Sequence, residues 1–310
     1  MTILNTIRGA VRSAAFVAAG IALGVAGTLA ATTALDLLPA ARAASEGPPL
    51  DHFPMSKLTD KAALQDGATT FVNYCLNCHS ASMMRYNRLQ DIGLTDQQIR
   101  NNLLFTGQKV GDTMKIAMRP EDAKAWFGAM PPDLTVIARA RSSGAGSGSD
   151  WLYTYLRSFY RDDTRATGWN NAVFPNVGMP HVFWDLQGSR GATIEEIKAV
   201  KDDKTGAVTG MKKIVVTFDD QGARTEKVEE MHGGHGAHES TTITLGQAKG
   251  GALDQARYDE KVANLVAYMT YMADPSAKSR TRIGVWVMMF LGLLTLFAWW
   301  LNREYWKDIK

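Results

Sequence analysis

The two cysteines of the chain stand three positions apart, at Cys75 and Cys78, and His79 follows directly. One helical turn places both thiols on the same side, where each can form a thioether bond to a haem vinyl group. The adjacent imidazole can then bind the iron from the proximal face. This segment therefore predicts one covalently attached haem c, and a haem held in this way usually carries electrons.

Paired cysteines also occur in redox-active thiol proteins and in structural zinc sites. A thioredoxin-like pair expects a βαβ context, which the sequence around residues 71–80 does not suggest. A zinc site needs four ligands, and the other cluster of candidate ligands is His232, His235 and His238, far along the chain in a glycine-rich stretch. We interpret that cluster as a solvated loop, with metal binding through neutral imidazoles as the alternative.

The N-terminus has the order of a secretory signal. Arg8 and Arg12 precede an uncharged run over residues 13–35, and the small-x-small sequence Ala41–Ala43 follows. We predict that residues 1–43 are a signal peptide and that the chain beyond them is exported. The apolar run is longer than a usual signal core, so an uncleaved membrane span is the alternative.

A second apolar run, Ile283–Leu301, carries no charged residue and has a length suited to a hydrocarbon core of ~30 Å. Trp286 near one end, and Trp299 with Trp300 near the other, are typical of an aromatic belt. We predict that residues 278–310 form a transmembrane anchor with a short cytoplasmic tail. Basic residues flank both ends of this run, so charge alone does not set its orientation, and the export signal decides it. We predict that the protein lies in a bacterial inner membrane with its head on the periplasmic side.

Between signal and anchor, we predict a periplasmic cytochrome c domain over residues 44–277 with a mainly α fold. Helix signals stand at Thr95 with Gln98, Pro120–Asp122, Asp150, and Tyr258–Met269. In the same order, these signals are a capping box, a proline followed by acidic residues, a carboxylate that can cap a helix, and an amphipathic repeat that leads into the membrane span.

The polar segment over about 188–250 differs from the rest of the head. Lys213–Phe218 and Thr241–Leu245 have the composition of strands, and Asp219–Gly222 has that of a turn. We therefore predict a β-rich insertion in the cytochrome domain. Residues 142–149 are rich in glycine and serine and predict a flexible surface loop.

A haem bound by His79 needs a sixth ligand, and methionine there gives a higher reduction potential than a second histidine. Met179 is the best placed candidate because it lies in Phe174–Pro180, a loop stiffened by glycine and proline. Met130, which precedes two prolines, and His181 are its rivals.

Several motifs together resemble one family. They run in the order Cys75–Ser80 with Tyr86 and Leu89 after it, Met130–Leu134, Ala138–Arg141, the Asn171–Pro180 loop, and the C-terminal span. The chain resembles cytochrome c1, the haem subunit of the quinol:cytochrome c oxidoreductase (the cytochrome bc1 complex), over most of residues 45–187 and 255–310. The glycine/serine-rich loop is longer than the family's usual connection, and the β-rich insertion has no counterpart in its shorter members.

The resemblance implies that Met179 is the sixth ligand and that Arg141 contacts a haem propionate. A guanidinium pairs well with a carboxylate, although a solvated helix face is the alternative for this arginine. Pro131 and Pro132 would line the haem pocket and exclude water. Trp151 stands where the family often has a tyrosine near a propionate.

The resemblance also implies the function. The chain would pass electrons from a Rieske iron–sulfur protein to a c-type cytochrome, beside a cytochrome b subunit and within a dimeric complex, with no acid–base catalyst of its own. We expect no nucleic-acid partner; although the whole chain carries a charge of +3, its exported head is acidic and suits a basic electron carrier. The alternatives are a free-standing anchored cytochrome and a gas sensor with an open sixth position.

Overall fold

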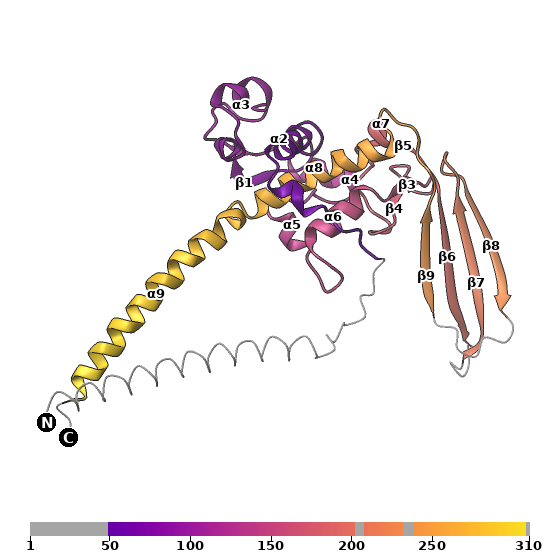
Figure 1. The fold of residues 1–310 in the computed structure, drawn as a ribbon. Coiled ribbons are helices and arrows are strands. Elements are labelled where there is room, and N and C mark those ends of the chain that lie inside the picture. The colour runs from indigo at the N-terminus through magenta and orange to yellow at the C-terminus, as the bar shows by residue number, and fades with distance from the viewer. Residues whose placement is uncertain (1–48, 202–207, 232–238, 308–310) are drawn as a thin grey trace. The chain divides into compact units, whose positions relative to one another are not determined.

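The computed structural model describes residues 49–201, 208–231 and 239–307 (Figure 1). The chain divides into two units, Met1–Ser45 and Glu46–Lys310, and every described residue belongs to the second. The predicted signal peptide and the histidines of residues 232–238 lie outside the described residues.

Helices surround the CxxCH segment. The α-helices of this part are α2 (Lys61–Thr70), α3 (Asp96–Asn102), α4 (Pro120–Phe127), α5 (Ile137–Ala140), α6 (Gly148–Leu156), α7 (Trp184–Gln187) and α8 (Gln255–Ala273). Shorter helical turns are η1 (Met55–Leu58), η2 (Phe71–Cys75) and η3 (Tyr86–Ile92). Their apolar faces form one core, to which α8 contributes an almost continuous buried stripe.

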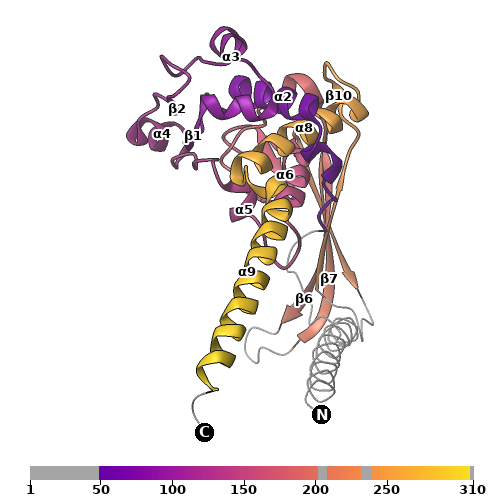
Figure 2. The same cartoon turned by 60° about the vertical axis from the view of Figure 1, so that its left-hand side comes forward.

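The helices α2 and α8 lie side by side (Figure 2). Gly67 on α2 makes this approach possible, because a Cβ atom there would lie 2.0 Å from the carbonyl oxygen of Asn264 on α8. One turn further along, the rings of Phe71 and Tyr268 pack with centroids 5.5 Å apart. Since α2 leads directly into the CxxCH segment, this contact fixes where that segment lies.

Two of the predicted helix starts are confirmed, and a third needs correction. Thr95 and Gln98 form the capping box of α3, and Pro120 occupies the first turn of α4. The residue that caps α6 is Ser147, with Asp150 as the third helical residue of the same capping box. The helix therefore begins inside the segment that we predicted as a loop over residues 142–149.

Short antiparallel strand pairs connect these helices. They are β1 (Ala81–Arg85) with β2 (Thr113–Met114), β3 (Phe159–Arg161) with β4 (Trp169–Asn171), and β5 (Gly188–Ser189) with β10 (Lys249–Gly250). The last pair joins the two ends of the predicted insertion. Gly188 has a φ of +82° there, and a Cβ atom on it would lie 2.1 Å from the carbonyl oxygen of Lys249.

The insertion contains an antiparallel sheet with the strand order β8-β7-β6-β9 (Figure 1). Its strands are β6 (Ala192–Lys201), β7 (Val208–Phe218), β8 (Arg224–Met231) and β9 (Ser240–Leu245). A small separate core of Tyr160, Ala192 and Phe218 anchors the sheet. The β-rich insertion is confirmed, as are the strands within β7 and β9 and the turn at Asp219.

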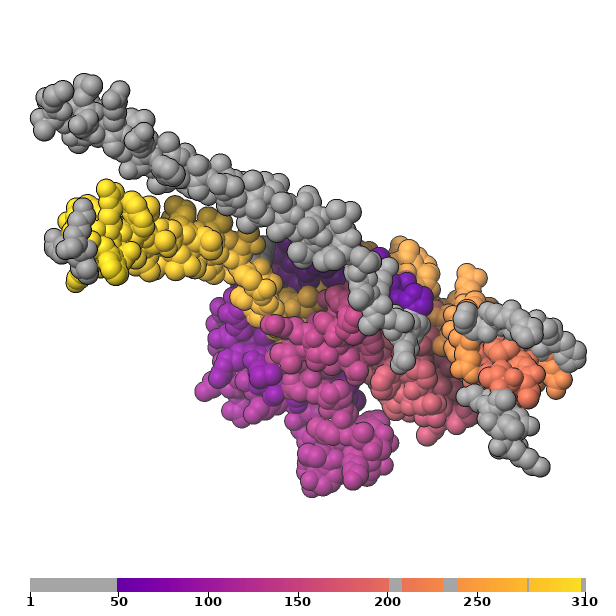
Figure 3. Space-filling model, turned by 90° about the horizontal axis from the view of Figure 1, so that it is seen from below, coloured from indigo at the N-terminus to yellow at the C-terminus, as the bar shows by residue number. Residues whose placement is uncertain are grey.

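The C-terminal helix α9 (Ala277–Tyr305) follows α8 and contains the predicted span. Among the described residues, Ser279–Tyr305 is the one helix long and apolar enough to cross a membrane. Its large apolar side chains, including Trp286 and Trp299, are exposed, and they form the yellow surface in Figure 3. This exposure differs from the burial of a core helix in a soluble protein, and the helix fits a single membrane span.

Candidate functional site

The CxxCH segment begins as a wider helical turn. Leu76 donates its N–H to the carbonyl of Phe71 (3.0 Å), five residues back, so η2 is a π-type turn at the end of α2. The N–H groups of Cys78 and His79 both bond to the carbonyl of Cys75, at 3.1 and 2.9 Å. These bonds coil the segment so that both sulfurs and the imidazole border the same cavity.

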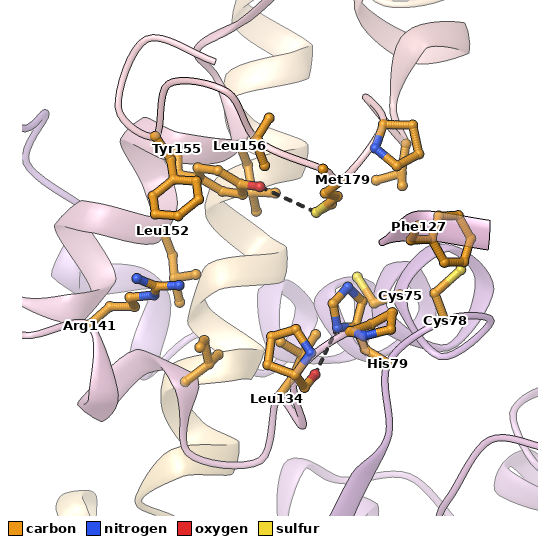
Figure 4. A pocket seen from close by; sticks show the side chains of 18 of the residues that line it. Cys75, Cys78, His79, Phe127, Leu134, Arg141, Leu152, Tyr155, Leu156 and Met179 are labelled. Atoms are coloured by element: carbon orange, nitrogen blue, oxygen red, sulfur yellow. Dashed lines mark hydrogen bonds between the residues drawn. The ribbon is translucent and has the colours of Figure 1, made fainter. Parts of the chain in front are cut away.

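This cavity, of about 300 Å³, has mainly apolar walls. Cys75, Cys78 and His79 form one side of it and Met179 the opposite side, as Figure 4 shows. The remaining lining includes both predicted prolines, Pro131 and Pro132, residues of α5, α6 and α8, and the loop after α4. The fold thus brings together all the residues that the sequence assigned to the site.

The orientation of His79 is set by a hydrogen bond that the sequence did not predict. Its Nδ1 lies 2.8 Å from the carbonyl oxygen of Pro132, an arrangement that suits an Nδ1–H donor and leaves Nε2 for a metal. Burial lowers the pKa of His79, against the opposing effect of the Pro132 carbonyl and Asp133. A neutral imidazole is the form that binds iron.

The two thiols do not have the electrostatics of a redox-active pair. Burial raises the pKa of Cys75 to about 12, with a smaller contribution from Cys78, and burial raises the pKa of Cys78 as well. Reactive cysteines require a lowered pKa, because the thiolate is the nucleophile. The surroundings therefore disfavour a thioredoxin-like activity, and the apolar cavity beside the sulfurs suits a planar hydrophobic cofactor.

The loop that carries Met179 is shaped by two buried asparagines. The side-chain oxygen of Asn171 accepts the N–H of Val173 (2.9 Å), and that of Asn170 accepts the N–H of Asn176 (2.8 Å). Asn176 adopts a left-handed conformation with a φ of +62°, which asparagine tolerates better than most residues. These bonds turn the chain back over the cavity.

The hydroxyl of Tyr155 donates a hydrogen bond to Sδ of Met179, with an O···S distance of 3.4 Å (Figure 4). Burial raises the pKa of Tyr155, although Arg141 opposes the shift, so the phenol stays protonated and remains a donor. We did not single out Tyr155 from the sequence. Its spacing of one helical turn from Trp151 was the available signal, because both then face the same side of α6.

The rivals of Met179 are placed differently. His181 is 1 % exposed, stacks on Phe159 with ring centroids 4.9 Å apart, and does not line the cavity. Met130 lines the cavity, but 43 % of its surface is exposed and it lies on the loop after α4. Met179 is therefore the candidate that lies opposite His79.

The two arginines of the Ala138–Arg141 motif have different surroundings. Arg141 borders the cavity, with Cζ 4.4 Å from the ring centre of Trp151 and 5.5 Å from that of Phe174. Arg139 points elsewhere and lies 3.8 Å from a carboxylate oxygen of Asp274. A guanidinium at the edge of an apolar cavity fits the carboxylates of a haem, so the donor set and the walls both fit this cofactor.

Comparison with known proteins decides the family. Residues 51–218 match the sequence model of the Cytochrome C1 family. The chain belongs to the cytochrome c1 family. The resemblance seen in the motifs is confirmed, and membership makes the chain the haem electron-transfer subunit of a cytochrome bc1 complex.

Several curated proteins are similar over most of their length. Cytochrome c1 of Allochromatium vinosum is 41% identical over 280 residues, 89% of this chain and 97% of the relative. A protein named ammonia monooxygenase gamma subunit, from Nitrosomonas europaea, is 40% identical over 270 residues, 87% and 92% of the two chains. Cytochrome c1 of Rhodospirillum rubrum is 24% identical over 278 residues, 81% of this chain and 83% of the relative. The match to the family model agrees with the relatives that are named cytochrome c1.

Proposed function

We propose that this cytochrome c1 carries one haem c, attached through Cys75 and Cys78 and held axially by His79 and Met179. The observation that carries the proposal is the placement of an imidazole and a thioether on opposite sides of one apolar cavity that both thiols border. When bound, the haem supplies one-electron redox chemistry. The protein supplies its attachment, orientation and surroundings.

Three further lining residues, two prolines and an arginine, have a part in this proposal. The carbonyl of Pro132 orients His79, and the rings of Pro131 and Pro132 keep water from the cofactor. Arg141 pairs with a propionate, which offsets the burial of that carboxylate. No side chain acts as an acid or a base, because the reaction moves an electron and breaks no bond.

The partners follow from the family. We propose that a Rieske iron–sulfur protein delivers the electron and that a c-type cytochrome accepts it, with the haem edge near the cysteines as the exit. A cytochrome b subunit would oxidise the quinol within a dimeric complex. The mainly α cytochrome c domain over residues 44–277 would lie on the periplasmic side of a bacterial inner membrane, after a signal peptide over 1–43 and before an anchor over 278–310.

Purification of the full chain tests the complex. A tag after Lys310 allows isolation from membranes in mild detergent, followed by optical measurement of b-type haem and electron paramagnetic resonance of a Rieske cluster. We expect both centres in the purified material. Their absence, with haem c retained, would favour a free-standing anchored cytochrome.

The covalent attachment has a direct test. Replacing both Cys75 and Cys78 with alanine should abolish haem that survives a denaturing gel, because no other cysteine exists in the chain. Replacement of either one alone should leave a single thioether. Persistence of covalent haem in the double variant would contradict the assignment.

A further inference from the structure

Tyr155 and Met179 come from different elements and meet at the edge of the cavity. Tyr155 lies on α6 and is 8 % exposed, whereas Met179 lies on the loop that the two asparagines shape. The phenol oxygen and the sulfur are 3.4 Å apart, within hydrogen-bonding distance for sulfur. Figure 4 shows the hydroxyl directed at the sulfur.

The packing of the Tyr155 ring sets this direction. Trp151 stacks on one side of it at 4.7 Å with an interplanar angle of 12°, and Phe159 meets it edge-on at 5.2 Å. The guanidinium of Arg141 lies over the ring of Trp151 and completes the stack. A thioether sulfur is a weak acceptor and would not by itself hold a phenol in place. The aromatic contacts therefore place the hydroxyl where the sulfur meets it.

We propose that Tyr155 is a positioning residue for the axial ligand, and that its hydrogen bond to Met179 raises the reduction potential of the haem. The inference rests on the proposed function, since Met179 must be the sixth ligand. A thioether sulfur has two lone pairs, so one would bind the iron while the other accepts the hydrogen bond from the phenol. The hydrogen bond withdraws electron density from the sulfur, and the ferric iron depends on that density more than the ferrous iron does.

Two consequences follow for this site. The bond holds the sulfur in one orientation, so the ligand stays in place when the iron changes oxidation state. It also adjusts the potential through a residue that touches the ligand and not the haem iron. Tyr155 thus helps to set the driving force for electron transfer from the haem to its acceptor.

The test is Tyr155→Phe in the full chain, purified with its complex and titrated potentiometrically. The ring and its stacking remain, and only the hydroxyl is lost. We expect the ratio of reduced to oxidised haem at a fixed potential to fall about threefold to tenfold. A tenfold change corresponds to a shift of about 59 mV to lower potential for a one-electron couple.

Tyr153→Phe is the matched control, because Tyr153 lies on the same helix but packs against Phe53 and Arg157. Its loss of a hydroxyl should leave the potential unchanged. Equal potentials for the two variants and the unaltered protein would overturn the inference. Thermal unfolding of both variants shows whether a shift accompanies a general loosening of the domain.

A separate measurement distinguishes this inference from the ligand assignment. The sulfur-to-iron charge-transfer band of the oxidised, unaltered protein reports whether methionine binds the iron. Its absence would overturn both the assignment of Met179 and the role of Tyr155. Its presence together with an unshifted potential in Tyr155→Phe would overturn the role of Tyr155 alone, and its presence with the expected shift would support both.

Discussion

Nδ1 of His79 lies 2.8 Å from the carbonyl oxygen of Pro132, and this bond connects the CxxCH segment to a residue 53 positions further along the chain. The next residue, Asp133, holds the proline segment in place. Its carboxylate accepts hydrogen bonds from Ser82 (N–H at 2.8 Å and hydroxyl at 2.7 Å) and from Thr135 (N–H at 2.9 Å). The orientation of the predicted proximal ligand therefore depends on an ionised aspartate outside the cavity.

This dependence predicts that the folded state loses stability in acid. Partial burial by itself would raise the pKa of Asp133, but the hydrogen bonds from Thr135 and Ser82 outweigh it and lower the pKa. A carboxylate whose pKa is lowered by folding stabilises the folded state fully when the pH is above its pKa in the unfolded chain, about 3.9. That stabilisation is lost as the pH falls through the pKa that the carboxylate has in the folded protein.

We expect Asp133→Asn to lower the thermal unfolding temperature at about pH 7. Below about pH 4, this temperature should fall less steeply with pH in the variant than in the unaltered protein. Haem absorbance during melting at several pH values provides the measurement. Asp122→Asn is a suitable control, because Asp122 pairs with Arg119 at the exposed start of α4. An equally steep acid decline in Asp133→Asn and the unaltered protein would contradict the prediction.

Loss of the Met179 sulfur should change the haem more than any other single substitution on the distal side. In Met179→Leu the apolar volume is kept while the ligand is removed, so we expect a lower potential and binding of carbon monoxide by the reduced protein. Optical spectra with and without carbon monoxide provide the measurement. Met130→Leu should leave the ligation intact, and a spectrum unaltered in Met179→Leu but altered in Met130→Leu would make Met130 the ligand.

Arg141 should contribute its charge to the potential. A cation beside the cavity favours the reduced haem, which carries one negative charge more, so Arg141→Gln is expected to lower the potential by the equivalent of on the order of 1 kcal/mol. Arg139→Gln is the matched control, because Arg139 lies two positions away and points to Asp274 instead. Equal shifts in potentiometric titrations of the two variants would exclude a specific contact between Arg141 and a propionate.

The local parts of the site could be predicted from the sequence, and the long-range parts could not. Cys75, Cys78 and His79 lie within one turn of helix, so their spacing alone indicates their joint role. The bond from Tyr155 to Met179 joins residues 24 positions apart and depends on how α6 packs under the loop. No periodicity in the sequence indicates such a contact, because tertiary packing determines it.

The same distinction applies to the insertion. The β-branched residues of β7 and β9 indicated strands, whereas β6 and β8 carry charged residues at many positions and did not. Both strands pair with β7, and contacts between strands support this pairing, among them the ion pair of Lys213 on β7 with Glu195 on β6 at 3.1 Å. Such cross-strand pairs become visible only when the register is known.

The insertion should be removable without loss of the haem site. Its sheet packs on the small core of Tyr160, Ala192 and Phe218, which is separate from the core around the cavity. At its base, Gly246 donates its N–H to the carbonyl of Gly191 at 2.9 Å, so the two glycines can be joined by an Asn-Gly turn in place of residues 192–245.

We expect this deletion variant to keep covalent haem and an unchanged potential while its thermal unfolding temperature falls. The fall is expected because the ring of Tyr160 loses the cover of Phe218, whose centroid lies 5.4 Å away. Adding Tyr160→Thr to the deletion removes the newly exposed ring and separates that effect from any effect on the cavity. A loss of haem, or a drop in potential as large as that of Met179→Leu, in both deletion variants would mean that the insertion supports the ligand loop. Retention of both properties would confine the sheet to a role away from the redox centre.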